Sequence, residues 1–540
     1  MGEKPAAASA EEAVRRQFLI PAAESGGEAR RQTLSDMLRR TALRVPEKPA
    51  LICGEECWTY AELDARVTEL AAGLAGRGLR PGDRVAALAR NSHWYVALRY
   101  AVARMGGVFV PVNFMLNADD IAYILDHCEP EILFVDASCA PQGLTAADRA
   151  GVRQRLYFPG DAGAAVSGAD SLADLLLAGA SFPLAAEADG RAIAQIIYTS
   201  GTESRPKGAM ISHEAVLWQI QSCLADCRWT ADSVQLNAMP LFHCAQLDAF
   251  LAPSLQVGGT NIIIPAPAPD IVIPMIERFG VTHFFAPPTV WISLLRSPLF
   301  DAHDLTSLRS GFYGASIMPV EVLKEMQQRL PKLDFWNCYG QTEITCIATV
   351  LKPEDQMRKA GSAGKPILHV ETRIVDDGMR DVAVGEVGEI VHRSPQLLTA
   401  YWRDPDKTAE AFAGGWFHSG DLGVMDDEGF ISVVDRKKDM IKSGGENVSS
   451  REVEEVVYQL AGVSEASVIG VPDAVWIEAV AAVVVARQGT ALTEAEVIAH
   501  CSRHLSRFKV PKRVIFADSL PRNASGKILK RELRERILTE

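Results

Sequence analysis

Residues 198–208 have the sequence YTSGTESRPKG and follow a short apolar run, residues 192–197, that is typical of a buried strand. Glycine lets backbone N–H groups approach an anion, while the loop's hydroxyls add donors and Lys207 adds a positive charge. The loop is therefore predicted to hold a polyphosphate, with a Ser- and Gly-rich surface loop as the alternative for this stretch alone. It is not a Walker loop, because Pro206 precedes the lysine and no Ser or Thr follows it.

The composition is that of an ordinary globular protein. The chain has 540 residues, of which 48% are hydrophobic, and its formal net charge is −13. This length predicts two to four domains, and the negative charge argues against a nucleic-acid partner. The apolar runs are shorter than the ~20 residues that span a membrane, and no signal-peptide core is evident. We therefore expect a cytoplasmic protein without integral membrane association.

Ten cysteines are scattered along the chain without a C-x-x-C pair or a zinc-ligand pattern. This distribution favours reduced thiols over disulfides or a zinc site. The sequence leaves the oligomeric state open, with a homodimer as one alternative.

Strands alternate with helices through the first half of the chain, which predicts α/β architecture with a parallel, doubly wound sheet. Residues 84–89 have the pattern of a strand, and residues 93–104 that of a helix. Residues 138–190 are rich in Ala, Gly and Asp, and we expect them to form a surface excursion. Further helices are predicted over residues 212–226, 288–296 and 320–329.

Changes in composition and in the predicted elements mark the domain boundaries. Residues 1–30 are predicted to be a flexible tail, and residues 31–435 a large N-terminal domain. Within that domain, short β-like runs over residues 344–435 predict a small barrel-like subdomain. Residues 436–540 have helices and strands of their own, so they predict a small α+β C-terminal domain.

Five further blocks follow the first one. They are PLFH at 240–243, YGQTE at 339–343, WFHSGD at 416–421, DRKKDMIKSGGEN at 435–447, and PRNASGK ending at Lys527. Together with the loop, they resemble the ordered motifs of the acyl-adenylate-forming superfamily, which includes acyl-CoA synthetases, luciferases and peptide-synthetase adenylation domains. The resemblance covers almost the whole chain after about residue 30.

This resemblance implies an ATP-dependent acyl-CoA synthetase. ATP, Mg²⁺ and coenzyme A would be required, and the acid would pass through an acyl-AMP with release of pyrophosphate. A medium- or long-chain fatty acid is the first expectation for the substrate, and an aryl or cinnamate-type acid is the alternative. An enzyme that loads a carrier protein, a luciferase, and a relative that only binds nucleotide are the rival readings. Intact Lys207, Glu343, Asp421 and Lys527 argue against the last of these.

The resemblance also assigns the nucleotide site. The β- and γ-phosphates would be held by Thr199, Ser200, Gly201, Thr202 and Lys207. Tyr339 would stack on the adenine, with Gly314 and Ala315 as a close backbone edge, and Gly340 and Gln341 would be further cofactor-binding residues. Asp421 would accept hydrogen bonds from both ribose hydroxyls, because a carboxylate has two acceptor oxygens. Arg436 would reach ribose or phosphate oxygens.

The remaining predicted roles are metal binding, contacts to the α-phosphate, and domain movement. Glu343 would bind Mg²⁺ with help from Thr199, and Thr342 would donate to the α-phosphate. Lys527 would bridge the carboxylate and the α-phosphate during adenylation. Lys438 would be the hinge about which a mobile C-terminal domain turns, after which Gly444 and Gly445 would line the pantetheine tunnel.

Three positions bear on the acyl pocket or depart from the family pattern. His243 and Gly314 would line the pocket, with a core histidine as the alternative for His243. Tyr313 stands before Gly314, where much of the family has a second glycine, and it is predicted either to shorten the acyl pocket or to point into the core. Glu203 lies in the phosphate loop, where the family more often has threonine, and is expected to point outward or pair with Arg205.

Overall fold

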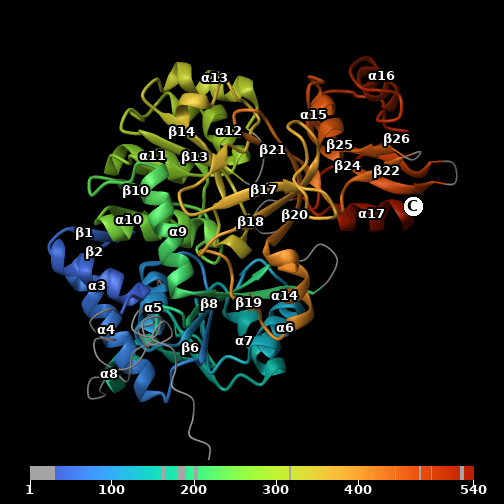
Figure 1. The fold of residues 1–540 in the computed structure, drawn as a ribbon. Coiled ribbons are helices and arrows are strands. Elements are labelled where there is room, and N and C mark those ends of the chain that lie inside the picture. Colours follow the sequence, from blue (N-terminus) through green and yellow to red (C-terminus); the bar gives the residue numbers. More distant parts are fainter. Residues whose placement is uncertain are drawn as a thin grey trace, which may run out of the picture.

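The computed structural model describes residues 31–159, 165–179, 189–199, 205–314, 318–443, 446–473, 476–487, 489–522 and 528–539 (Figure 1). Across these residues the strands form four sheets, two large and two small. The mixed α/β architecture with a smaller C-terminal unit agrees with the prediction. No helix in these ranges is long and apolar enough to cross a membrane.

The first large sheet carries the strand that leads into the phosphate loop. Its described strands have the order β19-β9-β8-β4-β3-β5-β6-β7. Most neighbours are parallel, but β8 pairs with β9 in antiparallel fashion. The strands are β3 (Arg84–Leu88), β4 (Val108–Pro111), β5 (Ile132–Val135), β6 (Gln154–Tyr157), β7 (Asp170–Ser171), β8 (Ile193–Thr199), β9 (Lys207–Ser212) and β19 (Ala400–Tyr401).

The helices of this half follow the predicted alternation with one correction. They are α3 (Leu34–Arg44), α4 (Tyr60–Gly76), α5 (His93–Arg104), α6 (Ala118–Cys128), α7 (Ala140–Ala150), α8 (Leu172–Gly179) and α9 (His213–Asp226). The expectation of a surface excursion over residues 138–190 was wrong for the described part of that range, residues 138–159 and 165–179. Helix α7 packs there, and strands β6 and β7 extend the parallel sheet. The small side chains hid the pattern, because Gly143 lies where a Cβ would press on Leu88 and Val135.

The second large sheet supplies the strand that ends at Tyr339. Its described order is β16-β15-β14-β13-β12-β10-β11-β1-β2. The strands are β1 (Pro49–Cys53), β2 (Glu56–Thr59), β10 (Val234–Asn237), β11 (Thr260–Ile263), β12 (His283–Phe285), β13 (Ser310–Gly314), β14 (Asp334–Tyr339), β15 (Thr349–Leu351) and β16 (Lys365–Pro366).

The helices around this sheet include the predicted ones and a π-helix that the sequence did not predict. They are α10 (Ala252–Val257), α11 (Pro269–Phe279), α12 (Pro288–Arg296) and α13 (Val320–Arg329), with 3-10 turns at Pro298–Phe300, Thr342–Ile344 and Pro353–Asp355. Residues 245–257, for which the sequence suggested no element, form a π-helix, η1 (Ala245–Leu251), followed by α10. Such π-turns are rare and often occur at functional sites.

The two smaller sheets follow. Where the sequence predicted a small barrel, an antiparallel sheet contains β17 (Glu371–Val375), β18 (Gly388–Arg393), β20 (Phe417–Met425) and β21 (Ile431–Arg436). Helix α14 (Pro405–Ala411) and a 3-10 turn (Ala413–Gly415) lie between β19 and β20. The C-terminal unit has β22 (Ile441–Ser443), β23 (Glu446–Val448), α15 (Ser450–Tyr458), β24 (Val463–Asp473), β25 (Ile477–Ala486), α16 (Glu494–His504), β26 (Arg513–Phe516) and α17 (Lys530–Thr539). Figure 1 shows this unit beside β20 and β21.

A buried ion pair joins the elements that carry the site. Arg99 of α5 pairs with Asp248 of η1, and both side chains are almost fully buried. Gln195 of β8 completes the network, because its amide donates to Asp248 at 2.7 Å and its carbonyl accepts from Arg99 at 3.0 Å. Burial raises the pKa of Asp248 to about 6 despite the arginine. Buried charges need such partners, so the network fixes η1 against the phosphate-loop strand.

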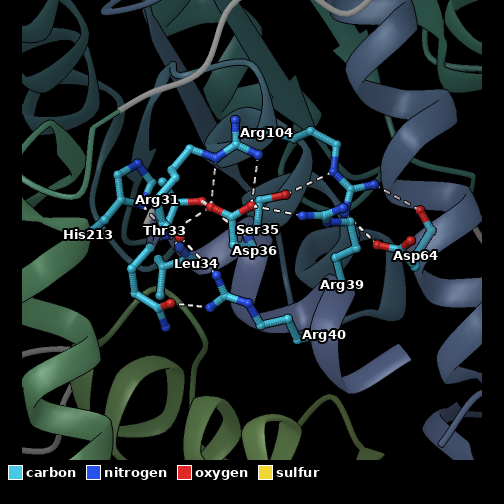
Figure 2. Close-up of polar contacts among 11 residues, drawn as sticks. Arg31, Thr33, Leu34, Ser35, Asp36, Arg39, Arg40, Asp64, Arg104 and His213 are labelled. Carbon is cyan, nitrogen blue, oxygen red and sulfur yellow. Dashed lines mark hydrogen bonds and ion pairs between the residues drawn. The ribbon is translucent and has the colours of Figure 1, made fainter. Parts of the chain in front are cut away.

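The start of α3 is a second polar centre (Figure 2). Thr33 caps the helix, and Asp36 accepts hydrogen bonds from the Thr33 side chain and backbone. Arg31 adds a bidentate contact to Asp36 at 2.9 Å. Burial acts to raise the pKa of Asp36, but these bonds lower it overall. The ring of His213 at the start of α9 accepts from the Leu34 backbone N–H at 3.4 Å, so the two helix starts are joined.

His213 generates a stability prediction. Burial lowers its pKa from 6.5 to about 4, so between these pH values the unfolded chain binds more protons than the folded one. The free energy of unfolding therefore falls as the pH falls below 6.5. The variant His213→Asn lacks the titrating ring. We predict that its free energy of unfolding falls between pH 7 and pH 5 by about 2 kcal/mol less than that of the wild type. Urea unfolding at both pH values measures this, and equal losses in the two proteins would refute the assignment.

Candidate active site

Two of the predicted nucleotide ligands, Tyr339 and Arg436, converge on the carboxylate of a third, Asp421. Tyr339 ends β14, Asp421 lies in β20, and Arg436 ends β21 directly opposite Asp421. The Tyr339 hydroxyl donates to one oxygen of Asp421 at 2.7 Å, and the Arg436 Nε lies 2.7 Å from the other. Burial raises the pKa of Tyr339 well above its usual value, so the phenol stays a donor. The arrangement brings an aromatic ring, a carboxylate and a guanidinium together as a compact polar site.

The glycines beside Tyr339 are needed for close backbone approach. A Cβ on Gly314 would lie 2.4 Å from the Cys338 carbonyl oxygen, and one on Gly340 would lie 2.0 Å from that of Cys346. Such separations are not tolerated, so any other residue would move the strand ends. Ala315, predicted to lie beside Gly314, is outside the described residues.

The phosphate side of the site is described in part. Ser200, Gly201 and Thr202 lie outside the described residues, as does the predicted outward position of Glu203. The flanking strands are described: the Thr199 hydroxyl donates to the Lys207 carbonyl at 3.5 Å across the β8–β9 pair. Thr199 and Lys207 therefore lie opposite each other where β8 and β9 enter the loop, which is compatible with a shared phosphate-binding role. That role stays a prediction.

Tyr401 is a site residue that the sequence did not predict. Its hydroxyl donates to Glu343 at 2.9 Å, and the Lys207 ammonium lies over its ring at 5.5 Å. It thus lies between the predicted metal ligand and the predicted phosphate ligand. No motif marks this tyrosine, because β19 is a two-residue strand whose pairing with β9 is not visible locally.

Glu343 fits a divalent cation by its chemistry. Burial raises the pKa of its carboxyl group, and a bound cation would keep that group ionised. A carboxylate oxygen is the hard donor that Mg²⁺ prefers, and the Thr199 hydroxyl is of the same class. The metal role of both residues remains a prediction.

The predicted acyl side of the site contains His243, Thr342 and an unpredicted thiol, Cys244. His243 accepts from the Ala245 backbone N–H at 3.2 Å, which fixes its ring at the start of η1. The thiol of Cys244 lies 3.7 Å from the His243 Nδ1 and 3.5 Å from the Thr342 hydroxyl. Burial acts to lower the pKa of His243, but Cys244 raises it overall. Gln341 adds a buried amide nitrogen that has no hydrogen-bond partner among the described residues.

Tyr313 lies in the core. Its side chain is 2% exposed, its hydroxyl donates to Gln356 at 2.8 Å, and its ring packs edge-on against Phe335. This position matches the core alternative, since strand side chains alternate and Tyr313 and Gly314 face opposite sides of β13. A role in limiting substrate length is left as a prediction for substrate tests.

The predicted hinge lies in an exposed turn after β21. Lys437 pairs with Glu389 of β18 at 3.1 Å, and Asp439 pairs with Arg534 of α17 at 3.1 Å. Lys438 stands between these two anchors, one on the large N-terminal part and one on the C-terminal unit. Gly444, Gly445 and Lys527, predicted to act during the two half-reactions, are outside the described residues.

Comparisons with known proteins cover nearly the whole chain. Residues 38–402 match the family model described as AMP-binding enzyme, and residues 452–527 match the AMP-binding enzyme C-terminal domain. A feruloyl-CoA synthase of an Amycolatopsis species is 38% identical over 94% of this chain and 100% of that protein. A long-chain-fatty-acid–CoA ligase of Mycobacterium tuberculosis is 36% identical over 92% of this chain and 97% of its own. The crystal structure of an anthranilate CoA ligase with anthranoyl-AMP superposes with a TM-score of 0.87 at 26% identity, covering 94% of this chain and 98% of the other.

Asp421 generates a binding prediction. If its carboxylate accepts both ribose hydroxyls, Asp421→Asn should weaken AMP binding about 30-fold, which corresponds to ~2 kcal/mol for hydrogen bonds to a charged acceptor. The matched control is Asp427→Asn, which neutralises an exposed carboxylate two residues beyond the end of β20. Calorimetric titration with AMP measures both. Unchanged affinity in the Asp421 variant would contradict the ribose role.

Proposed function

Because the chain belongs to the AMP-binding enzyme family and is an AMP-forming acid–thiol ligase, we propose that it joins an aromatic carboxylic acid to coenzyme A. The observation that carries the substrate class is the full-length similarity to a feruloyl-CoA synthase. The fold match to an anthranilate CoA ligase supports the same class. The fatty acid favoured from sequence becomes the second candidate, supported by the relative that acts on long-chain fatty acids.

The first half-reaction brings two anions together, so cations must offset their repulsion. The acid's carboxylate attacks the α-phosphate of ATP, and pyrophosphate leaves with the electron pair. Lys207 neutralises the leaving phosphates, and Thr342 donates to the α-phosphate. Lys527 bridges the attacking carboxylate and the α-phosphate as negative charge develops between them.

The nucleotide is positioned by the residues around Asp421. Tyr339 supplies a ring for the adenine, while Asp421 accepts from the ribose and Arg436 reaches the phosphate side. Arg436 already pairs with Asp421 at 2.7 Å, so its charge is held where the nucleotide binds. A Mg²⁺ ion bound by Glu343 and Thr199 would supply further positive charge to the phosphates.

In the second half-reaction the thiol of coenzyme A attacks the acyl carbonyl, and AMP leaves. His243 lines the path of this thiol at the acyl side. Gly444 and Gly445 line the pantetheine tunnel after the C-terminal domain has turned. The turn occurs at Lys438, because the residues before and after it are anchored to different units through Lys437–Glu389 and Asp439–Arg534.

A substrate panel tests the proposed class. The purified chain is given ATP, Mg²⁺, coenzyme A and one acid at a time, and the thioester is measured by chromatography with mass detection. We predict that ferulate or anthranilate gives a kcat/KM at least about tenfold above decanoate and palmitate. A fatty acid that matches or exceeds every aromatic acid would contradict the aromatic proposal. Product formed with a phosphopantetheinyl carrier instead of coenzyme A would support the carrier-loading alternative.

Lys438→Pro tests the hinge. Proline fixes φ near −65° and removes an N–H, so it should oppose the turn between half-reactions. We predict that acyl-AMP formation stays within about tenfold of wild type, while thioester formation from supplied acyl-AMP falls at least about a hundredfold. Lys438→Ala is the control, since it removes the side chain and keeps backbone freedom. Matched losses in both half-reactions would place the hinge elsewhere.

A further inference from the structure

Tyr401 contacts two predicted ligands with two different parts of its side chain. Its hydroxyl donates to the Glu343 carboxylate at 2.9 Å, while the Lys207 ammonium lies over the ring, 5.5 Å from its centre. The face of an aromatic ring is negative and attracts a cation. The tyrosine is 8% exposed, so water competes little for either contact. One side chain therefore lies between an anion and a cation that both belong to the candidate site.

The backbone of Tyr401 is fixed on both sides. Strand β19 pairs with β9, with Tyr401 opposite Ala209. The Trp402 N–H donates to the Gly208 carbonyl at 2.7 Å, one residue beyond the predicted phosphate ligand. The Tyr401 N–H donates to the Thr408 hydroxyl at 3.0 Å, at the start of α14. These bonds hold the tyrosine ring in place, so it can serve as a fixed support for the residues that it contacts.

The same segment also holds the backbone of Glu343. The Leu398 N–H donates to the Glu343 carbonyl at 2.7 Å. Glu343 lies in the 3-10 turn Thr342–Ile344 that follows β14 of the second large sheet, whereas β9 belongs to the first. Residues 398–402 therefore connect the predicted phosphate-binding hairpin to the predicted metal ligand. In the part of the chain that the structure describes, no ion pair joins Lys207 directly to Glu343.

We infer that Tyr401 is a positioning residue for the metal and polyphosphate end of the nucleotide. The inference rests on the proposed function, and in particular on the roles proposed there for Glu343 and Lys207. A hydrogen bond from a neighbouring side chain orients a metal-binding carboxylate, and the Tyr401 hydroxyl supplies that bond to Glu343. The ring holds Lys207 on the phosphate side. Tyr401 also keeps the two opposite charges from pairing with each other, which would remove the charge that each needs for its ligand.

Two substitutions separate the two contacts. Tyr401→Phe keeps the ring beneath Lys207 and removes the hydroxyl that donates to Glu343, whereas Tyr401→Leu removes both. Tyr60→Phe is the matched control, because the Tyr60 hydroxyl donates to the Gly259 carbonyl at 2.6 Å and is equally a buried hydrogen bond of a tyrosine. Thermal unfolding of each variant shows that the proteins compared are folded.

Calorimetric titration without acid or coenzyme A measures the effect. We expect Tyr401→Phe to weaken ATP binding in the presence of Mg²⁺ about tenfold and to leave metal-free pyrophosphate binding unchanged, since loss of a carboxylate's hydrogen-bond partner lowers metal affinity by about that factor. Tyr401→Leu should in addition weaken metal-free pyrophosphate binding about fivefold, because Lys207 loses the ring. Metal-free AMP should bind both variants within about twofold of wild type, and Tyr60→Phe should match wild type for every ligand.

A double-mutant cycle shows whether Tyr401 acts through Glu343. If it does, Glu343→Gln with Tyr401→Phe should bind ATP and Mg²⁺ no more weakly than Glu343→Gln alone. Additive losses, equal losses for AMP and for ATP with Mg²⁺, unchanged binding in Tyr401→Phe, or the same loss in Tyr60→Phe would overturn the inference. The titrations contain neither acid nor coenzyme A, so failure of this inference is distinguishable from failure of the aromatic-acid proposal in the substrate panel.

Discussion

The carboxylate of Asp421 is the point on which the arrangement of the site depends. It accepts from Tyr339 at the end of one large sheet and pairs with Arg436 at the end of the small antiparallel sheet. A charge buried this deeply is costly unless it is paired and hydrogen-bonded. Arg436 pairs with it within the small sheet, and the Tyr339 contact fixes the large sheet against the small one. The same two oxygens are the acceptors that a ribose would need. The group that holds the sheets together is therefore also the group assigned to the nucleotide.

The strand that carries Arg436 also meets the C-terminal unit. The neighbouring Asp435 accepts from the backbone N–H of Ser450 at 2.6 Å and from its hydroxyl at 2.7 Å, at the first turn of α15. The pair Asp435 and Arg436 in β21 thus touches the predicted nucleotide site on one side and the C-terminal unit on the other. A rotation at Lys438 that moves the C-terminal unit would break the bonds between Asp435 and Ser450. The orientation of the C-terminal unit would thereby be coupled to the strand that carries Arg436.

Much of this fold follows from local pattern, and the failures have physical causes. Helices α5, α12 and α13 begin and end at the predicted residues, because each has a local start signal: Ser92 caps α5, and Pro287 and Pro319 precede α12 and α13. Helix α7 was missed because its buried residues are Ala140, Gly143, Ala146 and Ala147, which give no strong hydrophobic pattern. The π-helix depends on Asp248 pairing with Arg99, some 150 residues away, and such long-range pairs leave no local signal. In the candidate site, the motif residues Tyr339, Asp421 and Arg436 lie together and their nucleotide role stays a prediction, whereas no motif records the contacts of Tyr401 and Cys244.

The central claim is that this site activates a carboxylic acid by forming an acyl-AMP. Exchange of labelled pyrophosphate into ATP, in the presence of an accepted acid and the absence of coenzyme A, tests it most directly. The account predicts acid-dependent exchange that disappears when the acid is omitted. Thioester formation without pyrophosphate exchange, or with exchange of inorganic phosphate instead, would contradict it.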